Sequence, residues 1–379
     1  MTLHELGWLQ YTRKHKFSSS EKSDNTTQPD EKNIGRVSVE NKTNFVLQTA
    51  EGELQGIIQG KFRHATKNQS DFPKVGDWVV FEKLRNEDKA IIKQVLPRYS
   101  MIARKSAGES TAPQIIASNV DSLFIVYGLD KPFNAPLIER YLSMAYEGGV
   151  EPIIILNKTD SAKSVSKLVK DAEALSAGLT VHAISARNKT GMSEVEALVE
   201  PGRTIAFVGP SGVGKSTIIN NILGSEVQAT GEVRLVDSKG RHTTTRREMF
   251  TLPHGGILID TPGIRELETL SSEDSVATLF SDIEKIVEQC RFKDCDHVKS
   301  KNCAVVEALK SGAISKERYN SFLKLKAEAE QSQNEDVYKR LDRKRAENKK
   351  SNARREAGLQ RKPQRTPPRK HPHRATRRK

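Results

Sequence analysis

The sequence contains little cysteine, few aromatic residues and a small apolar fraction. Of its 379 residues, three are cysteine, 6% are aromatic and 36% are hydrophobic. Three cysteines cannot all pair, and they fall within 14 consecutive residues, which argues against a disulfide framework and favours metal binding. The hydrophobic fraction is below the ~45–50% typical of globular domains, which indicates that part of the chain lies outside a folded core.

Long hydrophobic segments are also absent. Apolar runs such as residues 153–156 are far shorter than the ~18 residues that a membrane-spanning helix needs. This excludes an integral membrane protein. The first residues also lack the apolar region and cleavage site of a secretory signal, and we therefore expect a cytoplasmic protein with no membrane partner.

The net charge of +14 is unevenly distributed. Residues 339–379 carry 18 Lys and Arg against three acidic residues, a net charge of +15, whereas the rest of the chain has a net charge of −1. This tail contains four prolines and no apolar periodicity, so we expect it to be disordered. Basic segments of this kind often bind nucleic acid; a solvated extension is the alternative.

Four patterns divide the rest of the chain. Residues 1–35 are polar and predict a flexible leader. Residues 36–110 contain about five short strand patterns separated by turns, which predicts an OB-like β-barrel, either an oligonucleotide-binding fold or a scaffold. Residues 111–270 alternate apolar strands with helices, which predicts a parallel sheet covered on both faces. Residues 271–338 are helical and charged.

A phosphate-binding loop is the strongest motif. It has the form G-x-x-x-x-G-K-S, directly after the strand pattern 204–208 and before a helix pattern. Backbone N–H groups of such a loop surround the β-phosphate, its lysine neutralises the β- and γ-phosphate oxygens, and its serine ligates Mg²⁺. We expect nucleotide contacts from Gly209, Pro210, Ser211, Gly212, Val213, Gly214, Lys215, Ser216 and Thr217, with Lys215 and Ser216 also acting in catalysis.

A second phosphate-contacting segment starts 51 residues after Gly209, where an apolar strand pattern ends in Asp-x-x-Gly. Asp260 would lie on the metal side of the phosphates. The backbone N–H of Gly263 would contact the γ-phosphate and sense its presence.

A base-recognition motif, Asn-Lys-Thr-Asp, lies upstream of the phosphate loop. A carboxylate at Asp160 can accept hydrogen bonds from the N1–H and 2-amino groups of guanine, a donor pair that adenine lacks, and so select GTP over ATP. Asn157 would hold the loop, and the Lys158 stem would cover a face of the base. Taken alone, such a tetrapeptide can also be an ordinary surface segment. The expected base contacts are Asn157, Lys158, Thr159, Asp160, Ser185 and Ala186.

These motifs occur in a circularly permuted order relative to ordinary Ras-like GTPases. The base-recognition residues at 157 and 185 precede the phosphate loop at 209, whereas ordinary members begin with the phosphate loop. Permutation is tolerated because contacts in space are unchanged when the termini move to exposed loops. The switch segments then lead directly into the C-terminal region, so the nucleotide state could move that region.

The group that positions the attacking water is not the usual one. Many GTPases carry a glutamine directly after Asp-x-x-Gly, but this chain has Ile264 there. His242, in the polar stretch 240–247, is the candidate replacement; a solvated loop histidine is the alternative. We therefore expect slow hydrolysis by the protein alone. A hydroxyl from the same stretch would complete the Mg²⁺ shell, and its candidates are Thr243, Thr244 and Thr245.

Cysteine and histidine cluster between two helix patterns, expected over residues 272–289 and 304–331. The spacing Cys-x₄-Cys-x-His-x₅-Cys supplies three thiolates and one imidazole, a full tetrahedral Zn²⁺ shell without an open position. Buried free cysteines with an incidental histidine are the alternative. We expect one structural zinc site, with ligands Cys290, Cys295, His297 and Cys303.

The permuted motifs, the small β-barrel before them and the Cys₃His cluster after them resemble the bacterial small ribosomal subunit biogenesis GTPases of the RsgA or YjeQ type, over about residues 36–335. The resemblance implies an OB-fold barrel, a circularly permuted P-loop GTPase domain of the α/β class and a helical zinc-binding domain. It implies a GTP hydrolase that acts late in 30S subunit assembly, binds 16S rRNA, is stimulated by the subunit and links hydrolysis to release. The expected partners of this monomer are GTP, GDP, the 30S subunit and 16S rRNA.

Two other classes of function fit parts of the pattern. One is an RNA-binding assembly factor that does not hydrolyse its nucleotide, which Ile264 in place of glutamine would allow. The other is an ATPase or kinase with the same phosphate loop. Asp160 argues against the second class, because a carboxylate there favours guanine over adenine.

Overall fold

Every described residue of this computed structural model belongs to the first of two units, Met1–Ser332, and none to the second, Gln333–Lys379. The expected basic tail therefore lies outside the described residues. Among those residues, no helix has the length and apolar character needed to cross a membrane. The described residues are 2–15, 30–41, 43–60, 62, 66, 68–104, 113–224, 248–252, 254–260, 271–292, 295–297, 300 and 302–331.

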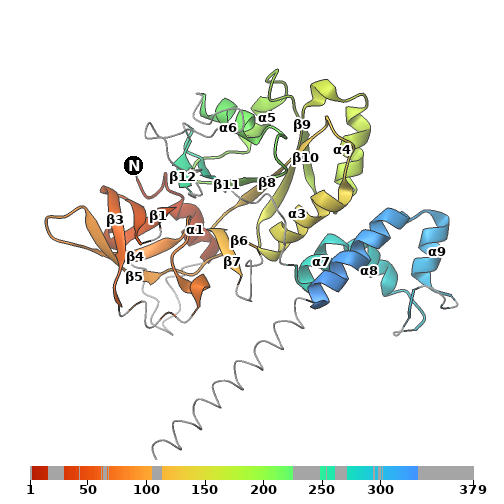
Figure 1. Cartoon of the computed structure of the whole chain (residues 1–379), viewed down its shortest axis with the longest axis horizontal. Helices are drawn as coiled ribbons and strands as arrows, with labels where there is room; N and C mark the ends of the chain where they lie inside the picture. Colours follow the sequence, from red (N-terminus) through yellow and green to blue (C-terminus); the bar gives the residue numbers. More distant parts are fainter. Residues whose placement is uncertain are drawn as a thin grey trace, which may run out of the picture. The chain divides into compact units, whose positions relative to one another are not determined.

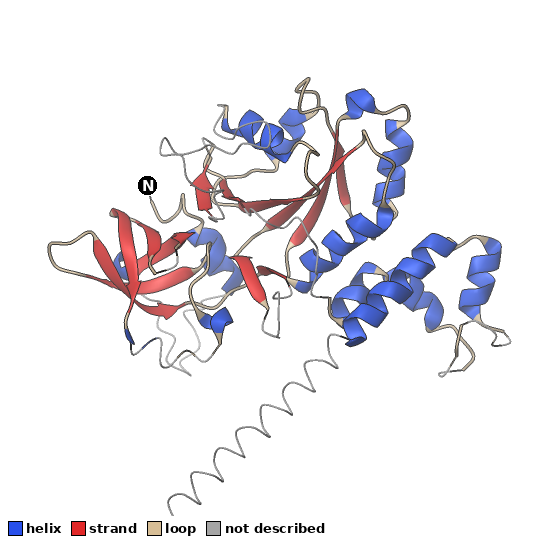
Figure 2. Cartoon of the chain, viewed as in Figure 1, coloured by secondary structure: helices blue, strands red, loops and turns tan. Residues whose placement is uncertain are grey.

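Five strands in the first part of the chain close into a barrel (Figures 1 and 2). They run in the order β1-β2-β3-β5-β4, and β4 pairs back with β1. Val37, Leu47 and Ile92 are among the buried side chains that fill the barrel. The expected OB-like barrel is confirmed. Its strands are β1 (Ile34–Glu40), β2 (Phe45–Thr49), β3 (Gly52–Ile58), β4 (Trp78–Lys83) and β5 (Lys89–Val95), and the hairpin of β6 (Met101–Arg104) and β7 (Gln114–Ser118) follows.

A sheet with helices on both faces follows the barrel (Figure 2). Its strands lie in the order β10-β9-β8-β11-β13-β12, all parallel except β12. In β8, Leu123 and Ile125 pack with helix α3, while Phe124 and Val126 pack with α6 on the other face. The expectation of a parallel sheet covered on both faces is thus confirmed. The elements are β8 (Ser122–Gly128), α3 (Ala135–Glu147), β9 (Glu151–Asn157), α4 (Val165–Glu173), β10 (Thr180–Ala183), α5 (Met192–Ala197), β11 (Thr204–Val208), α6 (Lys215–Leu223), β12 (Glu248–Thr251) and β13 (Ile257–Asp260).

The C-terminal region is helical, but its helices are shorter than expected. Helix α7 (Glu273–Leu279) is followed by the fully buried Phe280, and α8 (Ser281–Val287) begins at the next residue. Helix α9 (Ala304–Ser311) ends at Gly312, which has a φ of +77°, and a further helix covers residues 316–331. The expected single helices over 272–289 and 304–331 are therefore wrong, because the backbone leaves helical geometry at Phe280 (φ −107°, ψ 34°) and at the left-handed Gly312.

Helix α3 joins the sheet to this C-terminal region. The carboxylate of Glu139, 1% exposed, accepts hydrogen bonds from Arg318 at 3.1 Å and from the Ser321 hydroxyl. Burial raises the pKa of Glu139, and these two donors oppose the shift. Beside it, Arg140 forms a two-pronged ion pair with Glu328, with N–O distances of 2.8 and 2.7 Å. The contact between the two regions is therefore charged and partly buried.

The first residues of the chain are packed against the barrel. Helix α1 (Trp8–His15) buries Trp8 and Tyr11, which lie on one helical face, and Trp8 contacts Trp78 with ring centroids 4.8 Å apart. Leu6 is also fully buried. The expected flexible leader over 1–35 is therefore wrong for residues 2–15, because two large aromatic side chains one turn apart supply enough apolar surface to dock the segment.

A buried arginine joins this N-terminal segment, the barrel and the sheet. Arg36 is 1% exposed. Its guanidinium donates to the carbonyl oxygens of Leu6 (2.6 Å), Gly76 (3.2 Å) and Asn119 (3.1 Å) and to the hydroxyl of Thr204 (2.9 Å). These four acceptors are uncharged, and burial lowers the pKa of Arg36. One side chain thus satisfies polar atoms from three parts of the fold.

We expect Arg36→Met to lower the free energy of unfolding by about 2–4 kcal/mol, because it leaves several buried acceptors without a donor. Tryptophan fluorescence during urea unfolding reports on this junction, since both tryptophans of the chain, Trp8 and Trp78, lie there and Arg36 is 5.4 Å from the Trp78 ring. Arg85→Met, in an exposed turn, is the matched control. Equal unfolding midpoints for the two variants would contradict the role given to Arg36.

Candidate functional site

Strand β11 carries the phosphate loop to the C-terminal edge of the sheet. All residues of β11 are buried, and Gly209 follows it with a φ of +139°. Helix α6 then begins at Lys215, after Gly214 as its N-cap. The Lys215 ammonium donates to the carbonyl oxygens of Gly209 (2.6 Å) and Pro210 (2.7 Å). The loop therefore curls around its own lysine at a helix N-terminus, a position that favours anions.

Strand β9 carries Asn157 to the same edge. Asn157 is 3% exposed; its side-chain amide donates to the carbonyl of Val213 at 2.8 Å and accepts from the N–H of Ala186 at 2.9 Å. A Cβ atom on Gly214 would lie 2.2 Å from the Asn157 amide nitrogen, so this contact requires glycine there. One side chain thus connects the phosphate loop, the loop after β9 and the segment after β10.

Asp160 and Ser185 also come together. The Ser185 hydroxyl donates to the Asp160 carboxylate at 2.5 Å and thereby lowers the pKa of Asp160. The Asp160 side chain is exposed, and its second oxygen accepts only a long hydrogen bond of 3.5 Å from the Ser161 hydroxyl, so this oxygen is accessible to donors from a ligand. The N–H of Thr159 donates to the carbonyl of Ile184 at 3.1 Å, which fixes the base-recognition loop against the end of β10. The arrangement is an ionised carboxylate presented by a well-anchored loop.

Two residues that the motifs did not indicate contact this site. The Asp130 carboxylate lies 2.8 Å from the Lys158 ammonium, and the Asn221 amide donates to the carbonyl of Ala186 at 2.7 Å. The sequence contains a signal for Asp130, which follows the apolar run of β8 by two residues. Since β8 is parallel to β9 and β11, a polar residue there reaches the same edge of the sheet. Asn221 has no comparable signal.

The remaining predicted site residues are only partly described. Asp260 is the last residue of β13, which pairs in parallel with β11, so its backbone lies at the edge that holds the phosphate loop. The other predicted residues of the switch segments lie outside the described residues, and they are His242, Thr243, Thr244, Thr245, Gly263 and Ile264.

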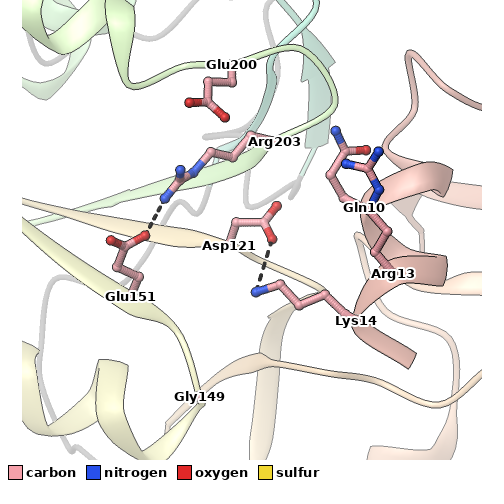
Figure 3. Close-up of a pocket in the computed structure, with 8 residues that line it drawn as sticks. All are labelled: Gln10, Arg13, Lys14, Asp121, Gly149, Glu151, Glu200 and Arg203. Atoms are coloured by element: carbon pink, nitrogen blue, oxygen red, sulfur yellow. Dashed lines mark hydrogen bonds and ion pairs between the residues drawn. The ribbon is translucent and has the colours of Figure 1, made fainter. Parts of the chain in front are cut away.

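The opposite edge of the sheet holds a cavity of about 550 Å³ between α1 and the strand starts (Figure 3). Asp121 precedes β8, Glu151 begins β9 and Arg203 precedes β11. Arg203 pairs with Glu151, and Lys14 lies 3.8 Å from Asp121, as the dashed lines in Figure 3 show. Because cations and anions alternate around it, the cavity does not favour a polyanion such as a nucleoside triphosphate.

The predicted metal ligands form a tight cluster in the C-terminal region. The ligand atoms of Cys290, Cys295, His297 and Cys303 all lie within 4.8 Å of one another. The Sγ atoms of Cys290 and Cys303 are 3.9 Å apart, and His297 Nδ1 lies 3.6 and 3.5 Å from them. Tetrahedral zinc with ordinary bond lengths requires S–S separations of about 3.8 Å and S–N separations of about 3.6 Å. The donor set therefore fits a zinc ion, which would crosslink the loop before α9.

Several known proteins are similar to this chain in sequence. The RsgA GTPase family model matches residues 95–270. The chain is 42% identical over 296 residues to the small ribosomal subunit biogenesis GTPase RsgA 1 of Oceanobacillus iheyensis, which covers 78% of this chain and 84% of that protein. The chain belongs to the RsgA GTPase family. As a member of this family it is a GTP-hydrolysing enzyme.

Solved structures resemble this RsgA-family chain over most of its length. YjeQ from Thermotoga maritima has a TM-score of 0.59 at 25% identity and covers 78% of this chain and 98% of its own. YloQ, a circularly permuted GTPase, has a TM-score of 0.57 at 22% identity, covers 82% of this chain and 98% of its own, and supports the fold alone. Since β9 and β10 precede β11 along this chain but lie in the same sheet, the expected circular permutation is confirmed.

An ABC transporter family model also matches the chain, over residues 192–355. This range includes the phosphate loop at 209–216, whose G-x-x-x-x-G-K-S form is common to P-loop proteins of many families. The RsgA relatives match over a much larger share of the chain. The shared phosphate loop accounts for the second match.

We expect the purified protein to contain one zinc ion per chain and His297→Gln to reduce this content severalfold, because three thiolates alone leave the tetrahedral shell incomplete. Zinc measured by mass spectrometry after gel filtration tests the ligand assignment, and the free energy of unfolding should fall by at least about 2 kcal/mol. His254→Gln, at an exposed turn, is the matched control. Wild-type protein without stoichiometric zinc would contradict the site.

Proposed function

We propose that this enzyme binds GTP at the edge where β8, β9 and β11 end, and that it acts in biogenesis of the small ribosomal subunit, the process named for its relatives. The contacts of Asn157 are the main support for the GTP site. Its buried amide joins the base-recognition segments to the phosphate loop. These contacts support a single site, because they join two motifs that are separate in the sequence. The cytoplasm, where ribosomal subunits are assembled, is then its place of action.

Guanine is the base that suits the Asp160 carboxylate. The carboxylate accepts from N1–H and the 2-amino group of guanine, while adenine offers no such donor pair. Its lowered pKa keeps it ionised at neutral pH. The Ser185 hydroxyl donates to one oxygen of this carboxylate. The N–H of the next residue, Ala186, donates to the side chain of Asn157. Asn157 and Ser185 therefore orient the loop, and Asp160 determines the base.

Hydrolysis takes place at the phosphate loop. Ser216, a switch threonine and Asp260 would hold a Mg²⁺ ion, which would supply positive charge to the β- and γ-phosphates. The Lys215 ammonium exchanges its two loop carbonyls for phosphate oxygens when GTP binds. His242 orients the water that attacks the γ-phosphate, with GDP as the leaving group. The Ile264 side chain cannot supply a hydrogen bond to this water, so the reaction is slow until the subunit stimulates it.

The contacts with the small subunit are electrostatic in part. The barrel and the zinc-binding region would contact 16S rRNA, and the tail, with its net charge of +15, would add a strong nonspecific attraction to phosphates. The switch segments lead directly into residues 271–331, so loss of the γ-phosphate is communicated to the C-terminal region. Release of the GDP-bound protein from the subunit follows from that change.

We expect Asp160→Asn to reduce GDP affinity by at least about 100-fold, because it removes the acceptor for the 2-amino group of guanine. The asparagine amide can donate to the 2-oxo group of xanthine, so affinity for xanthosine diphosphate should rise in the same variant. Titration calorimetry with both nucleotides measures the exchange. Asp88→Asn, in an exposed barrel turn, is the control; a variant that still prefers GDP would refute the base assignment.

We expect slow GTP hydrolysis by the purified protein and at least about a tenfold increase on addition of small ribosomal subunits, with ATP not used. Phosphate release at moderate salt with Mg²⁺ measures both rates. His242→Ala should retain GTP binding and lose the stimulated rate. Equal stimulation by large subunits, or equal use of ATP, would contradict the proposed function.

A further inference from the structure

Asp130, in the loop between β8 and α3, belongs to none of the sequence motifs described above. Its carboxylate lies 2.8 Å from the ammonium of Lys158, the lysine of the base-recognition segment. The two side chains are about one-third exposed, at 36% and 30%. The Lys158 ammonium is the first cause of the lowered pKa of Asp130, so the carboxylate is ionised at neutral pH.

The loop that carries Asp130 is anchored on both sides. The Tyr127 hydroxyl donates to the carbonyl of Pro132 at 2.5 Å, and the Tyr127 and Phe133 rings lie 5.9 Å apart. The N–H of Leu129 donates to the carbonyl of Asn157 at 2.8 Å, which ties the loop to the base-recognition segment. The position of Asp130 is therefore determined by the fold before any nucleotide is present.

The Asp130 carboxylate folds back over Gly128, beside the phosphate loop. A Cβ atom on Gly128 would lie 2.6 Å from Asp130 Oδ1 and 3.6 Å from the Cα of Val213. Glycine at 128 thus leaves room for the carboxylate next to the phosphate loop. The carboxylate thus contacts Lys158 and adjoins Gly128, which lies beside Val213 of the phosphate loop.

Lys158 has an uncommon backbone conformation, which sets the direction in which its side chain leaves the backbone. Its φ of +66° and ψ of +41° are left-handed, which is uncommon for a residue with a side chain. A free lysine side chain has about 2 kcal/mol of rotamer entropy that an ordered stem must lose. The ion pair with Asp130 restricts the stem in advance, so less of that cost falls on nucleotide binding.

We propose that Asp130 is a positioning residue for the nucleotide base, which holds the Lys158 ammonium so that the lysine stem lies along one face of the purine. The proposal rests on the assignment of the guanine site to Asn157–Asp160. Asp130 does not touch the nucleotide; it acts through Lys158. The base edge is read by Asp160, and its face is covered by the stem that Asp130 orients.

This division predicts different effects on base selectivity. Inosine nucleotides lack the 2-amino group of guanine but present the same faces, so a defect in the stem weakens GDP and IDP equally. A defect at Asp160 changes the ratio of the two affinities, because it acts on the edge. An exposed ion pair is also screened by salt, so the effect of Asp130 should shrink in 1 M NaCl, whereas a purely steric role would not.

The test is titration calorimetry of full-length protein with GDP and IDP, at low and high salt, for Asp130→Asn, Lys158→Met and the double variant. Asp130→Asn should raise both dissociation constants about twofold to fivefold, the range for an ion pair of this exposure, with their ratio unchanged. The double variant should bind no more weakly than Lys158→Met. Glu87→Gln, which removes the exposed Glu87–Lys89 pair of the barrel, is the matched control and should bind as wild type.

Wild-type affinity in Asp130→Asn, or a loss that adds fully to that of Lys158→Met, would overturn the role of Asp130 while leaving the guanine site in place. A fall in melting temperature that accounts for the weaker binding would also overturn it. Absence of GDP binding by the wild-type protein would instead overturn the guanine site itself, and this proposal with it.

Discussion

The candidate nucleotide site depends on the buried amide of Asn157. Parallel strands bring the loops after β9 and β11 to one edge of the sheet, but strand pairing alone leaves loops free to move apart. Asn157 donates to the phosphate loop and accepts from Ala186, so both of its polar groups are satisfied within the site. A buried amide with one partner missing would cost about 1–3 kcal/mol. The loops are therefore held together whether or not they are adjacent in the sequence, which is what a circular permutation requires.

A second buried polar side chain, Arg36, joins segments at the opposite edge of the sheet, where the strands begin. Arg36 binds oxygen atoms from the N-terminal segment, the barrel and the start of β11. Thr204, its partner in β11, lies one strand length before the phosphate loop. The barrel is thus hydrogen-bonded to the strand that leads into the phosphate loop. The barrel and the candidate nucleotide site belong to the same unit of the chain.

Most of the site could be predicted from the sequence because its motifs combine backbone-specific residues with a required order of strands. Gly209 to Ser216 and Asn157 to Asp160 each follow an apolar run, and a parallel sheet places such loops at one edge. The clustering of Cys290, Cys295, His297 and Cys303 was also predictable, since four donors at short spacing lie close together when one loop folds back on itself. Trp8 and Tyr11 are visible in the sequence as aromatic residues one helical turn apart, but docking of residues 2–15 also depends on the tertiary surface around Trp78 that receives them. The break at Phe280 was not predictable, because the sequence has no helix-breaking residue where the backbone leaves helical geometry.

The contacts of α3 limit how the nucleotide can affect the C-terminal region. The same helix follows the loop of Asp130 and carries Glu139 and Arg140, which hold residues 316–331 through Arg318 and Glu328. The base-recognition half and the C-terminal helices are thus linked by charged contacts within one unit. Removal of one partner of a partly buried pair is costly, so these contacts resist separation. Under the proposed function, a signal from loss of the γ-phosphate would reach the C-terminal region along the chain, because the permuted order places the switch segments directly before α7.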